Sequence, residues 1–408
     1  MENVVIIQRV VPHYRVPLFK ELHRQFGWRV VSASNPPANT SLSLCREEEF
    51  LYATPYLYPC VDREYLAIVP VKQIIEELKP RAIIAEFSLQ MSSTWQLVMS
   101  HRLRRGRPIL FWSHGPTDHW ADNTLASLVI NKIKRTLAER ADAHITYTEG
   151  GRKRLLQETA VRRCFVATNS LDVAAIRQAG EPCAPLQAPG SPVVVAIGRI
   201  TQDKNMPGLL QAFAIFRQNF SRAVLYVIGG GPGWAALKSA NEAAGDTGVI
   251  LLGPLYEEVA IAPYLKAADI CVIPGAAGLS VNHALAYGVP VVLFEQSQSG
   301  PRHHPEVEYV VNDVTGWRVG PATPEALAAK LVDLFSRTPW PRPAIAANLR
   351  RYVDQNIMLE NMVDGFRRVN EFLDAGAHEG DPQHRDEAHR AAEVGSGLGP
   401  DGKITRRT

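Results

Sequence analysis

The sequence predicts an α/β protein built from two doubly wound parallel sheets, each in its own domain. The chain has 408 residues, and a single domain usually takes about 100–200. Short apolar runs alternate with helical stretches along most of its length. Within each run the residues are continuously apolar, which is typical of parallel strands covered by helices on both faces.

The predicted elements follow one another in strand–helix order. In the first half we expect strands at 4–7, 82–85, 109–112, 144–147 and 165–167, and helices at 71–78 and 126–138. In the second half we expect strands at 193–197, 224–228, 249–252, 270–273 and 291–294, and helices at 206–220 and 324–337. A last helix is predicted over 349–372, because its apolar residues recur near every 3.6 positions.

One segment interrupts this alternation and divides the chain. Residues 180–192 hold four prolines and two glycines, which is typical of a linker. We therefore expect a first domain over 1–180, a linker over 181–192 and a second domain over 193–345. The helical region 346–373 is predicted to pack back toward the first domain, and the polar segment 374–408 to be disordered.

Composition and charge exclude several classes of protein. Hydrophobic residues make up 46% and charged residues 21%, as in globular proteins, and no run approaches the ~18 apolar residues of a membrane-spanning helix. The five cysteines form no CxxC pair, so neither a zinc site nor a disulfide framework is predicted. The apolar run at 4–7 is too short for a signal peptide, which favours a cytoplasmic location.

The net charge of +3 conceals a basic first half. Residues 1–175 hold 23 Lys and Arg against 17 Asp and Glu, a net of +6, so the rest of the chain carries −3. The excess gathers at Arg102, Arg104, Arg105 and Arg107, and again at Lys132, Lys134 and Arg135. Such patches attract anionic surfaces such as lipid headgroups, and a solvated helix face is the alternative.

Cations and glycines follow the predicted strands, where open α/β sheets bind ligands. After strand 193–197, Gly198 allows a turn, and Arg199 and Lys204 place two cations suited to a diphosphate. Two ordinary surface cations are the alternative. After strand 224–228, residues 229–233 are rich in glycine, but Trp234 replaces the third glycine of a dinucleotide fingerprint, so NAD binding is rejected.

The segment after strand 270–273 predicts an anion site at the start of a helix. Its small residues include Gly275 and Gly278, and the backbone N–H groups of Gly278, Leu279 and Ser280 would point at a phosphate. His283, one turn later, could bind a ribose or phosphate, or be a core histidine.

Two loops complete the candidate site. In loop 300–308, Glu306 and Glu308 suit sugar hydroxyls better than a metal, because the adjacent His303 and His304 cannot easily share one ion. In the first half, His114 precedes a glycine at a strand end.

Taken together, these motifs resemble the GT-B fold retaining glycosyltransferases of family 4, the glycosyl transferases group 1, over about residues 4–370. The segments of the second half that show this resemblance are AIGRITQDKNMPGLLQAF, YVIGGGPG, LLGPLYEEVAIAPYLKAADICVIP, NHALAYGVPVV and PEVEYVVNDVTGW. The first half is similar more loosely, in PHYRVPLFKEL, FWSHGP, YTEGGRKRL and TNSLD. The resemblance implies two Rossmann-like domains facing each other across a cleft.

The resemblance also implies a reaction: a sugar leaves a nucleotide donor and joins an acceptor hydroxyl with retention, without a metal or another cofactor. Arg199 and Lys204 would hold the diphosphate, Gly253 and Leu255 would lie by the base, and His114 beside the sugar. Glu308 falls at the acid of the Pro-Glu loop. On family frequency, a UDP-sugar is favoured over a GDP-sugar.

The sequence departs from the family at one motif. The family carries two glutamates eight residues apart, and Gly275 and His283 stand at those positions. A subgroup with a PGxxGL start and a histidine at the second position is more similar. We hypothesise that Glu306, Glu308 or the backbone of residues 275–278 replaces the missing contact to the donor sugar.

Acceptor and partners are predicted only by class. The expected acceptor is a glycan or lipid-linked molecule of polysaccharide or lipopolysaccharide biosynthesis, with the basic first domain docked on an anionic membrane. The alternatives are a catalytically impaired GT-B scaffold that binds a nucleotide or a partner, and a sugar-nucleotide epimerase. A nucleic-acid binder is disfavoured, because the basic patches lack interleaved aromatic residues.

Overall fold

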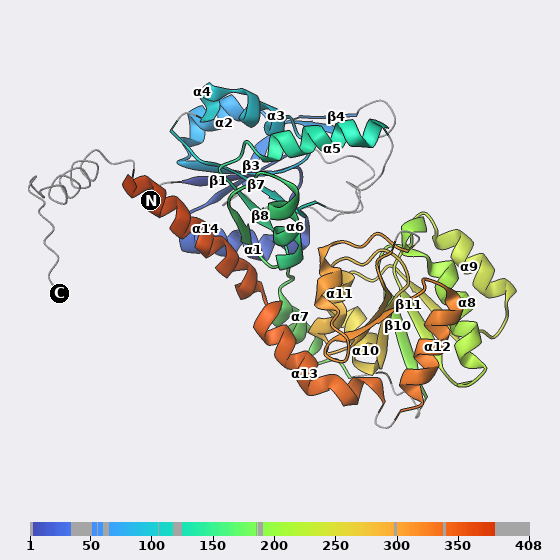
Figure 1. Ribbon diagram of the computed structural model, residues 1–408. Coiled ribbons are helices and arrows are strands. Elements are labelled where there is room, and N and C mark those ends of the chain that lie inside the picture. Colours follow the sequence, from blue (N-terminus) through green and yellow to red (C-terminus); the bar gives the residue numbers. More distant parts are fainter. Residues whose placement is uncertain are drawn as a thin grey trace, which may run out of the picture.

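The protein has two α/β domains joined side by side, as seen in a computed structural model (Figure 1). The structure describes residues 3–33, 51–54, 56–59, 65–104, 106–116, 125–184, 186, 191–297, 300–337 and 340–379. The predicted α/β fold with two Rossmann-like sheets is confirmed.

The first domain is built on a seven-stranded parallel sheet in the order β3-β2-β1-β6-β7-β8-β9. Its strands are β1 (Val4–Gln8), β2 (Arg29–Ala33), β3 (Leu51–Thr54), β6 (Ala82–Glu86), β7 (Ile109–Ser113), β8 (Ala143–Thr146) and β9 (Cys164–Val166). A separate antiparallel pair joins β4 (Tyr56–Pro59) to β5 (Tyr65–Ile68). The helices are α1 (Val16–Phe26), α2 (Val71–Leu78), α3 (Ser92–Met99), α4 (His101–Arg104), α5 (Leu125–Ala138) and α6 (Glu149–Glu158), with the 3-10 turn η1 (His13–Arg15).

The second domain is built on a six-stranded parallel sheet in the order β12-β11-β10-β13-β14-β15. Its strands are β10 (Val193–Ile197), β11 (Val224–Ile228), β12 (Val249–Gly253), β13 (Ile270–Ile273), β14 (Val291–Phe294) and β15 (Gly316–Val319). The helices are α7 (Val173–Gly180), α8 (Met206–Arg217), α9 (Trp234–Ala243), α10 (Glu258–Ala267), α11 (Ser280–Ala286), α12 (Pro324–Phe335) and α13 (Pro341–Asn356), with the 3-10 turns η3 (Gln202–Lys204) and η4 (Pro305–Tyr309).

Strand β1 shows why the predicted strands are apolar at every position. In β1, Val4 and Ile6 belong to one buried cluster, whereas Val5 and Ile7 belong to another on the opposite face of the sheet. Successive side chains of a strand point to opposite faces, so a strand covered on both sides must be apolar at every position.

The boundary between the domains lies earlier than the proline-rich segment predicts. Helix α7, expected in the first domain, packs in the second, because Val173 and Ile176 are buried in the core of the second sheet. Arg177 Nε also donates to the Ala286 carbonyl at 3.1 Å. The chain therefore crosses between β9 and α7 rather than at 181–192, where only part of the segment is described.

The chain returns to the first domain through its last helix, α14 (Leu359–Glu379) (Figure 1). Instead of the single predicted helix, α13 ends at Asn356 and α14 begins at Leu359, because Ile357 is buried in the second core and Met362 in the first. Ser170 donates a hydrogen bond to the Ile357 carbonyl, so the two crossing segments are bonded to each other.

The end of α14 corrects the predicted start of the polar tail. Residues 374–379 are helical, and Asp374 forms an ion pair with Arg81 at 2.6 Å. The rest of the predicted tail, 380–408, lies outside the described residues. Within the described ranges, no helix is both long and apolar enough to cross a bilayer.

Candidate active site

A small pocket of about 20 Å³ lies at the carboxyl ends of β10 and β13 in the second domain. It brings together three predicted donor-site residues, Gly198, Lys204 and Ser280. The remaining lining residues are Ile197, Met206, Val272, Ile273 and Pro274. Neighbouring strands β10 and β13 deliver these loops to one edge of the sheet, as in other open α/β folds.

Lys204 is the cation of this pocket. It ends η3, and the left-handed backbone of Asn205 (φ 48°) turns the chain directly into α8. Its Nζ donates to the Ala276 carbonyl and lies 3.7 Å from the carboxylate of Asp203. Burial lowers the pKa of Lys204, the Asp203 carboxylate opposes that shift, and Arg199 adds to it. The Arg199 side chain is exposed at the same edge of the domain.

Gly275 is packed against the backbone of the Lys204 turn. A Cβ at this position would lie 2.1 Å from the Asp203 carbonyl oxygen and 2.6 Å from the Cα of Lys204. The Ala276 N–H donates to that same carbonyl at 2.9 Å. No side chain fits at position 275, because its backbone is in close contact with the backbone of residues 203–204. This packing excludes a glutamate at the position of the first glutamate in the family motif.

The predicted anion site at residues 278–280 forms the start of α11. Leu279 is the N-cap, and its carbonyl accepts from the His283 N–H at 3.0 Å, while the Val281 N–H donates a turn bond to the Gly278 carbonyl at 2.9 Å. The N–H groups of residues 278–280 therefore precede the helical ladder. A Cβ on Gly278 would lie 3.7 Å from the His304 ring, an ordinary contact.

His303 supports this loop rather than a metal. Its Nδ1 accepts from the Ala277 N–H at 3.0 Å, and its Nε2 donates to the Phe294 carbonyl at 2.9 Å. Burial lowers the pKa of His303, which agrees with the neutral ring that these two bonds require. Among the described residues no cluster of three His, Cys, Asp or Glu side chains could hold a metal ion.

His283, the second departure from the family motif, is bonded to a carboxylate that the sequence analysis did not select. Its Nε2 lies 3.0 Å from the carboxylate of Glu258, the first residue of α10, and the Tyr287 hydroxyl donates to the same carboxylate at 2.9 Å. Burial and the Glu258 charge raise the pKa of Tyr287. Glu258 lies a few residues after the predicted base loop, and this position is the sequence signal that could have identified it as a site residue.

The predicted base-site residues lie on that loop. Gly253 ends β12 in a left-handed conformation (φ 78°), with space for a Cβ at 3.8 Å from Trp234. Leu255 is half-buried against the core of the second domain. Tyr256, the next residue, is 82% exposed, so its ring is accessible beside the loop.

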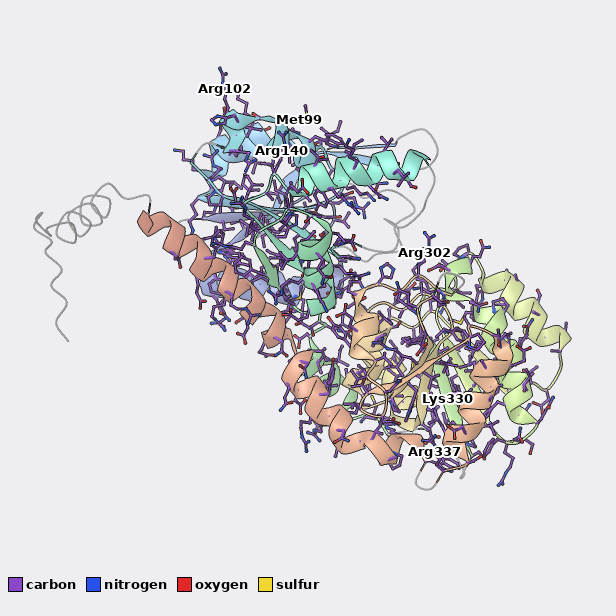
Figure 2. The ribbon with its side chains drawn as sticks, in the orientation of Figure 1. Met99, Arg102, Arg140, Arg302, Lys330 and Arg337 are labelled. Carbon is purple, nitrogen blue, oxygen red and sulfur yellow. The ribbon has the colours of Figure 1, made fainter. Side chains whose placement is uncertain are left out.

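His114 lies where the two domains meet. It follows β7, and its ring stands 5.1 Å from the Tyr147 ring in the first domain and 5.6 Å from the His304 ring in the second. Figure 2 shows Arg302, a cation not selected from the sequence, on the side of the second domain that faces the first.

Glu308 crosses to the first domain and caps a helix there. Its carboxylate accepts from the Thr148 hydroxyl at 2.9 Å and from the Gly150 N–H at 3.0 Å, at the start of α6. A carboxylate at a helix N-terminus is stabilised by the unpaired N–H groups and the helix dipole. Both oxygens of Glu308 are thus held by the first domain.

Glu306 is buried in the same interface. It is 3% exposed, accepts from Asn169, and its Oε2 has no hydrogen-bond partner within the described part of the chain. Asn169 in turn accepts from Arg15, which is stacked against the Trp112 and Tyr147 rings of the first domain. Burial raises the pKa of Glu306, and the charges of Arg15 and Lys204 oppose this shift. Arg15 and Asn169 complete a polar chain between the domains; their segments, PHYRVPLFKEL and TNSLD, were noted in the sequence, but these two residues were not predicted to be site residues.

One segment of the second domain matches a known family model. Residues 191–337 match the family model of the glycosyl transferases group 1. This match contains the pocket, its Lys204 turn, α11 and the Glu306–Glu308 loop. A comparison with curated protein sequences finds no match.

Solved structures share the whole two-domain fold. A sucrose-phosphate synthase from Thermosynechococcus elongatus is 16% identical, with a TM-score of 0.66 over 92% of this chain and 100% of that one. The Anabaena protein HepE in complex with UDP is 16% identical, with a TM-score of 0.63 over 92% and 100%. TarM from S. aureus, as a mutant in complex with Fondaparinux, alpha-GlcNAc-glycerol and UDP, is 11% identical, with a TM-score of 0.63 over 90% and 99%. These structures show the two-domain fold, and the group 1 match is confined to residues 191–337.

Proposed function

We propose that this protein is a retaining, metal-independent hexosyltransferase that moves a sugar from a nucleotide donor to a hydroxyl of a glycan or lipid-linked acceptor. The observation that carries the proposal is the pocket of Gly198, Lys204 and Ser280 within the segment that matches the glycosyl transferases group 1. A polysaccharide or lipopolysaccharide is the proposed product class, made in the cytoplasm.

The proposed source of catalysis is electrostatic stabilisation of the transition state. The diphosphate leaves as positive charge builds on the sugar ring, and Lys204, with Arg199 beside it, stabilises the developing negative charge. The N–H dipoles of residues 278–280 would also stabilise this negative charge. Because Lys204 is half-buried and anchored to the Ala276 carbonyl, its charge needs little reorganisation during the reaction.

Retention is proposed to follow from attack on the face that the diphosphate leaves. The departing phosphate deprotonates the acceptor hydroxyl, so no side-chain nucleophile is required. The engagement of both Glu308 oxygens by the first domain supports this, since Glu308 is then a cleft-closing group rather than a nucleophile. His114, at the meeting of the domains, is proposed to lie beside the transferring sugar.

Nucleotide recognition is proposed to use the loop of Gly253 and Leu255 for the base. His283 and Glu258 would bind the ribose. The Glu258 carboxylate on α10 would supply the acid that α11 lacks, since α11 carries His283 in place of the second glutamate of the family motif. UDP is the first nucleotide to test, because HepE and TarM, which share this fold, were each solved with UDP.

A thermal-shift panel of UDP, GDP, TDP, CMP, ADP and NAD tests the nucleotide site. A ligand at about 100 times its Kd adds about 2.7 kcal/mol, and each kcal/mol raises the Tm by about 2–4 °C for domains of this size. Stabilisation by one nucleoside diphosphate supports the proposal. The matching sugar nucleotide is then incubated with the protein, and NMR of the released or transferred sugar reports whether the anomeric configuration is kept.

A second candidate is a nucleotide-binding GT-B scaffold without turnover. It is favoured by one observation, the exclusion of any side chain at Gly275. Stabilisation by a nucleotide without hydrolysis or transfer of its sugar would select this candidate. If no nucleotide stabilises the chain, both candidates fail.

A further inference from the structure

Helix α5 has an apolar surface that faces away from the protein. Leu128, Val129, Ile130 and Ile133 are 53%, 60%, 43% and 36% exposed, whereas the polar Asn131 is buried. A surface helix of a globular protein normally shows the opposite arrangement, with its apolar stripe toward the core. Single exposed aliphatic residues are ordinary, but four within six positions of one helix form a patch.

This apolar surface lies outside the buried clusters of its own domain. The buried hydrophobic clusters of the described structure take only Leu137 and Ala138 from α5, both from its last turn. The exposed aliphatic residues between 128 and 133 therefore belong to none of these clusters. Helix formation in proteins usually depends on burial of one face, so this face is suited to a partner.

The surroundings of the patch are rich in cations, of which Arg135 pairs with Glu158 at 3.9 Å and Arg104 with Asp142 at 3.4 Å. The α5 sequence LASLVINKIKRTLA holds Lys132, Lys134 and Arg135 and no acidic residue. Beyond its end, a hollow is lined by Val98, Met99, His101, Arg104, Gly106 and Arg140, and Met99 is 76% exposed. Figure 2 shows Met99, Arg102 and Arg140 together on the outer side of the first domain, away from the second. We call α5 residues 128–135 with these three residues the outer face.

Charge decides between the two occupants that such a face could have. If a second copy bound symmetrically, the α5 cations of one chain would meet those of the other, which is unfavourable. An anionic bilayer complements both properties, because aliphatic side chains enter the interfacial region while Lys and Arg contact headgroup phosphates.

We propose that the outer face docks the protein on an anionic lipid bilayer, with α5 lying in the plane of the interface. Leu128, Val129, Ile130 and Ile133 enter the headgroup–acyl boundary, and Lys132, Arg102 and Arg140 bind lipid phosphates. This docking extends the membrane attachment expected from the basic first domain by naming its surface and its apolar component. It does not rest on the proposed transferase activity.

The test is co-sedimentation of the full chain with vesicles, either pure phosphatidylcholine or equal parts phosphatidylcholine and phosphatidylglycerol. The double variant Leu128→Ser/Val129→Ser removes apolar area, and Lys132→Gln/Arg102→Gln removes charge. Ile250→Ser is the matched control, because Ile250 is 44% exposed on β12 of the second domain. A Val129→Trp variant reports insertion by a blue shift and by quenching with brominated lipid.

We expect the wild type and Ile250→Ser to bind the anionic vesicles alike. Leu128→Ser/Val129→Ser should bind at least about tenfold more weakly, since a buried aliphatic side chain contributes about a factor of ten. Lys132→Gln/Arg102→Gln should lose a similar factor, at about 1 kcal/mol for each cation, and high salt should weaken wild-type binding.

Three results would each overturn the proposal. The first is no binding of the wild type to anionic vesicles at low salt. The second is unchanged binding of Leu128→Ser/Val129→Ser together with an unquenched Trp at 129. The third is a wild-type dimer in sedimentation velocity that this double variant abolishes, which would assign the face to self-association. The nucleotide panel is independent of all three, so failure of the proposed function is recognised separately.

Discussion

Substitution of Gly275 by alanine tests whether the donor pocket depends on the close approach of two backbones. The added Cβ would lie 2.1 Å from the Asp203 oxygen, 2.5 Å from the Lys204 carbonyl carbon and 2.6 Å from its Cα. None of these atoms is the end of a flexible side chain. The turn that carries Lys204 must therefore move, and the bond from the Ala276 N–H to Asp203 must lengthen.

The magnitude follows from these contacts. Overpacking of this kind costs about 1–3 kcal/mol, and a weakened hydrogen bond adds about 1 kcal/mol. At about 2–4 °C for each kcal/mol, the Tm of Gly275→Ala should fall by roughly 4–16 °C. Displacement of Lys204 should also weaken binding of the stabilising nucleotide by about tenfold or more.

Gly278→Ala is the matched control, because its Cβ would meet only the His304 ring at 3.7 Å. Thermal unfolding and calorimetric nucleotide titration are measured on both variants and on Gly275→Glu, which restores the family residue. We expect Gly278→Ala to resemble the wild type and Gly275→Glu to be no better than Gly275→Ala. If Gly275→Ala unfolds and binds as the wild type does, the packing argument is refuted.

Three further predictions concern single carboxylates and cations. Lys204→Met should lower kcat/KM for transfer by about 10²–10³, as removal of one transition-state donor does, whereas Lys330→Met on α12 should leave it unchanged; equal losses would contradict the assigned role. Glu258→Gln should weaken nucleotide binding by about tenfold, because the amide has no charge and only one acceptor oxygen for His283, Tyr287 and the proposed ribose. The exposed neighbour Glu257→Gln should not weaken it, and calorimetry compares the two variants. Burial raises the pKa of Glu306, so the native state holds its proton more tightly than the unfolded chain. The associated stability is present below the unfolded pKa and is lost as pH rises through the folded pKa. The Tm of Glu306→Gln should therefore rise relative to wild type between pH 4.5 and pH 8, and a constant difference would argue against it.

Many elements of the fold could be predicted from the sequence because their residues are constrained on both faces. The strands at 193–197, 224–228, 270–273 and 291–294 have the predicted ends, since a strand buried on both sides leaves an uninterrupted apolar run. The strands β2, β3, β4, β5 and β15 were missed. In β2 and β15 a polar residue within a short run, Ser32 or Arg318, weakens that pattern.

The candidate site was predictable to the extent that it follows strand ends. Gly198, Lys204 and Ser280 come from loops after β10 and β13, and the parallel topology alone brings such loops to one edge. Glu258 was not predictable in the same way. Its partner His283 lies on another helix, and no local spacing indicates that α10 and α11 meet there.

What the sequence by itself determined is therefore local: apolar periodicity, glycines at turns and cations after strands. What only the tertiary structure decided is which groups meet across the domains. Glu308 caps α6 of the first domain, although 158 positions separate it from Gly150. Gly275 excludes a side chain because a distant turn fills the space. Burial and hydrogen bonding between remote segments depend on the packed arrangement of the whole chain, and no short stretch of residues encodes them.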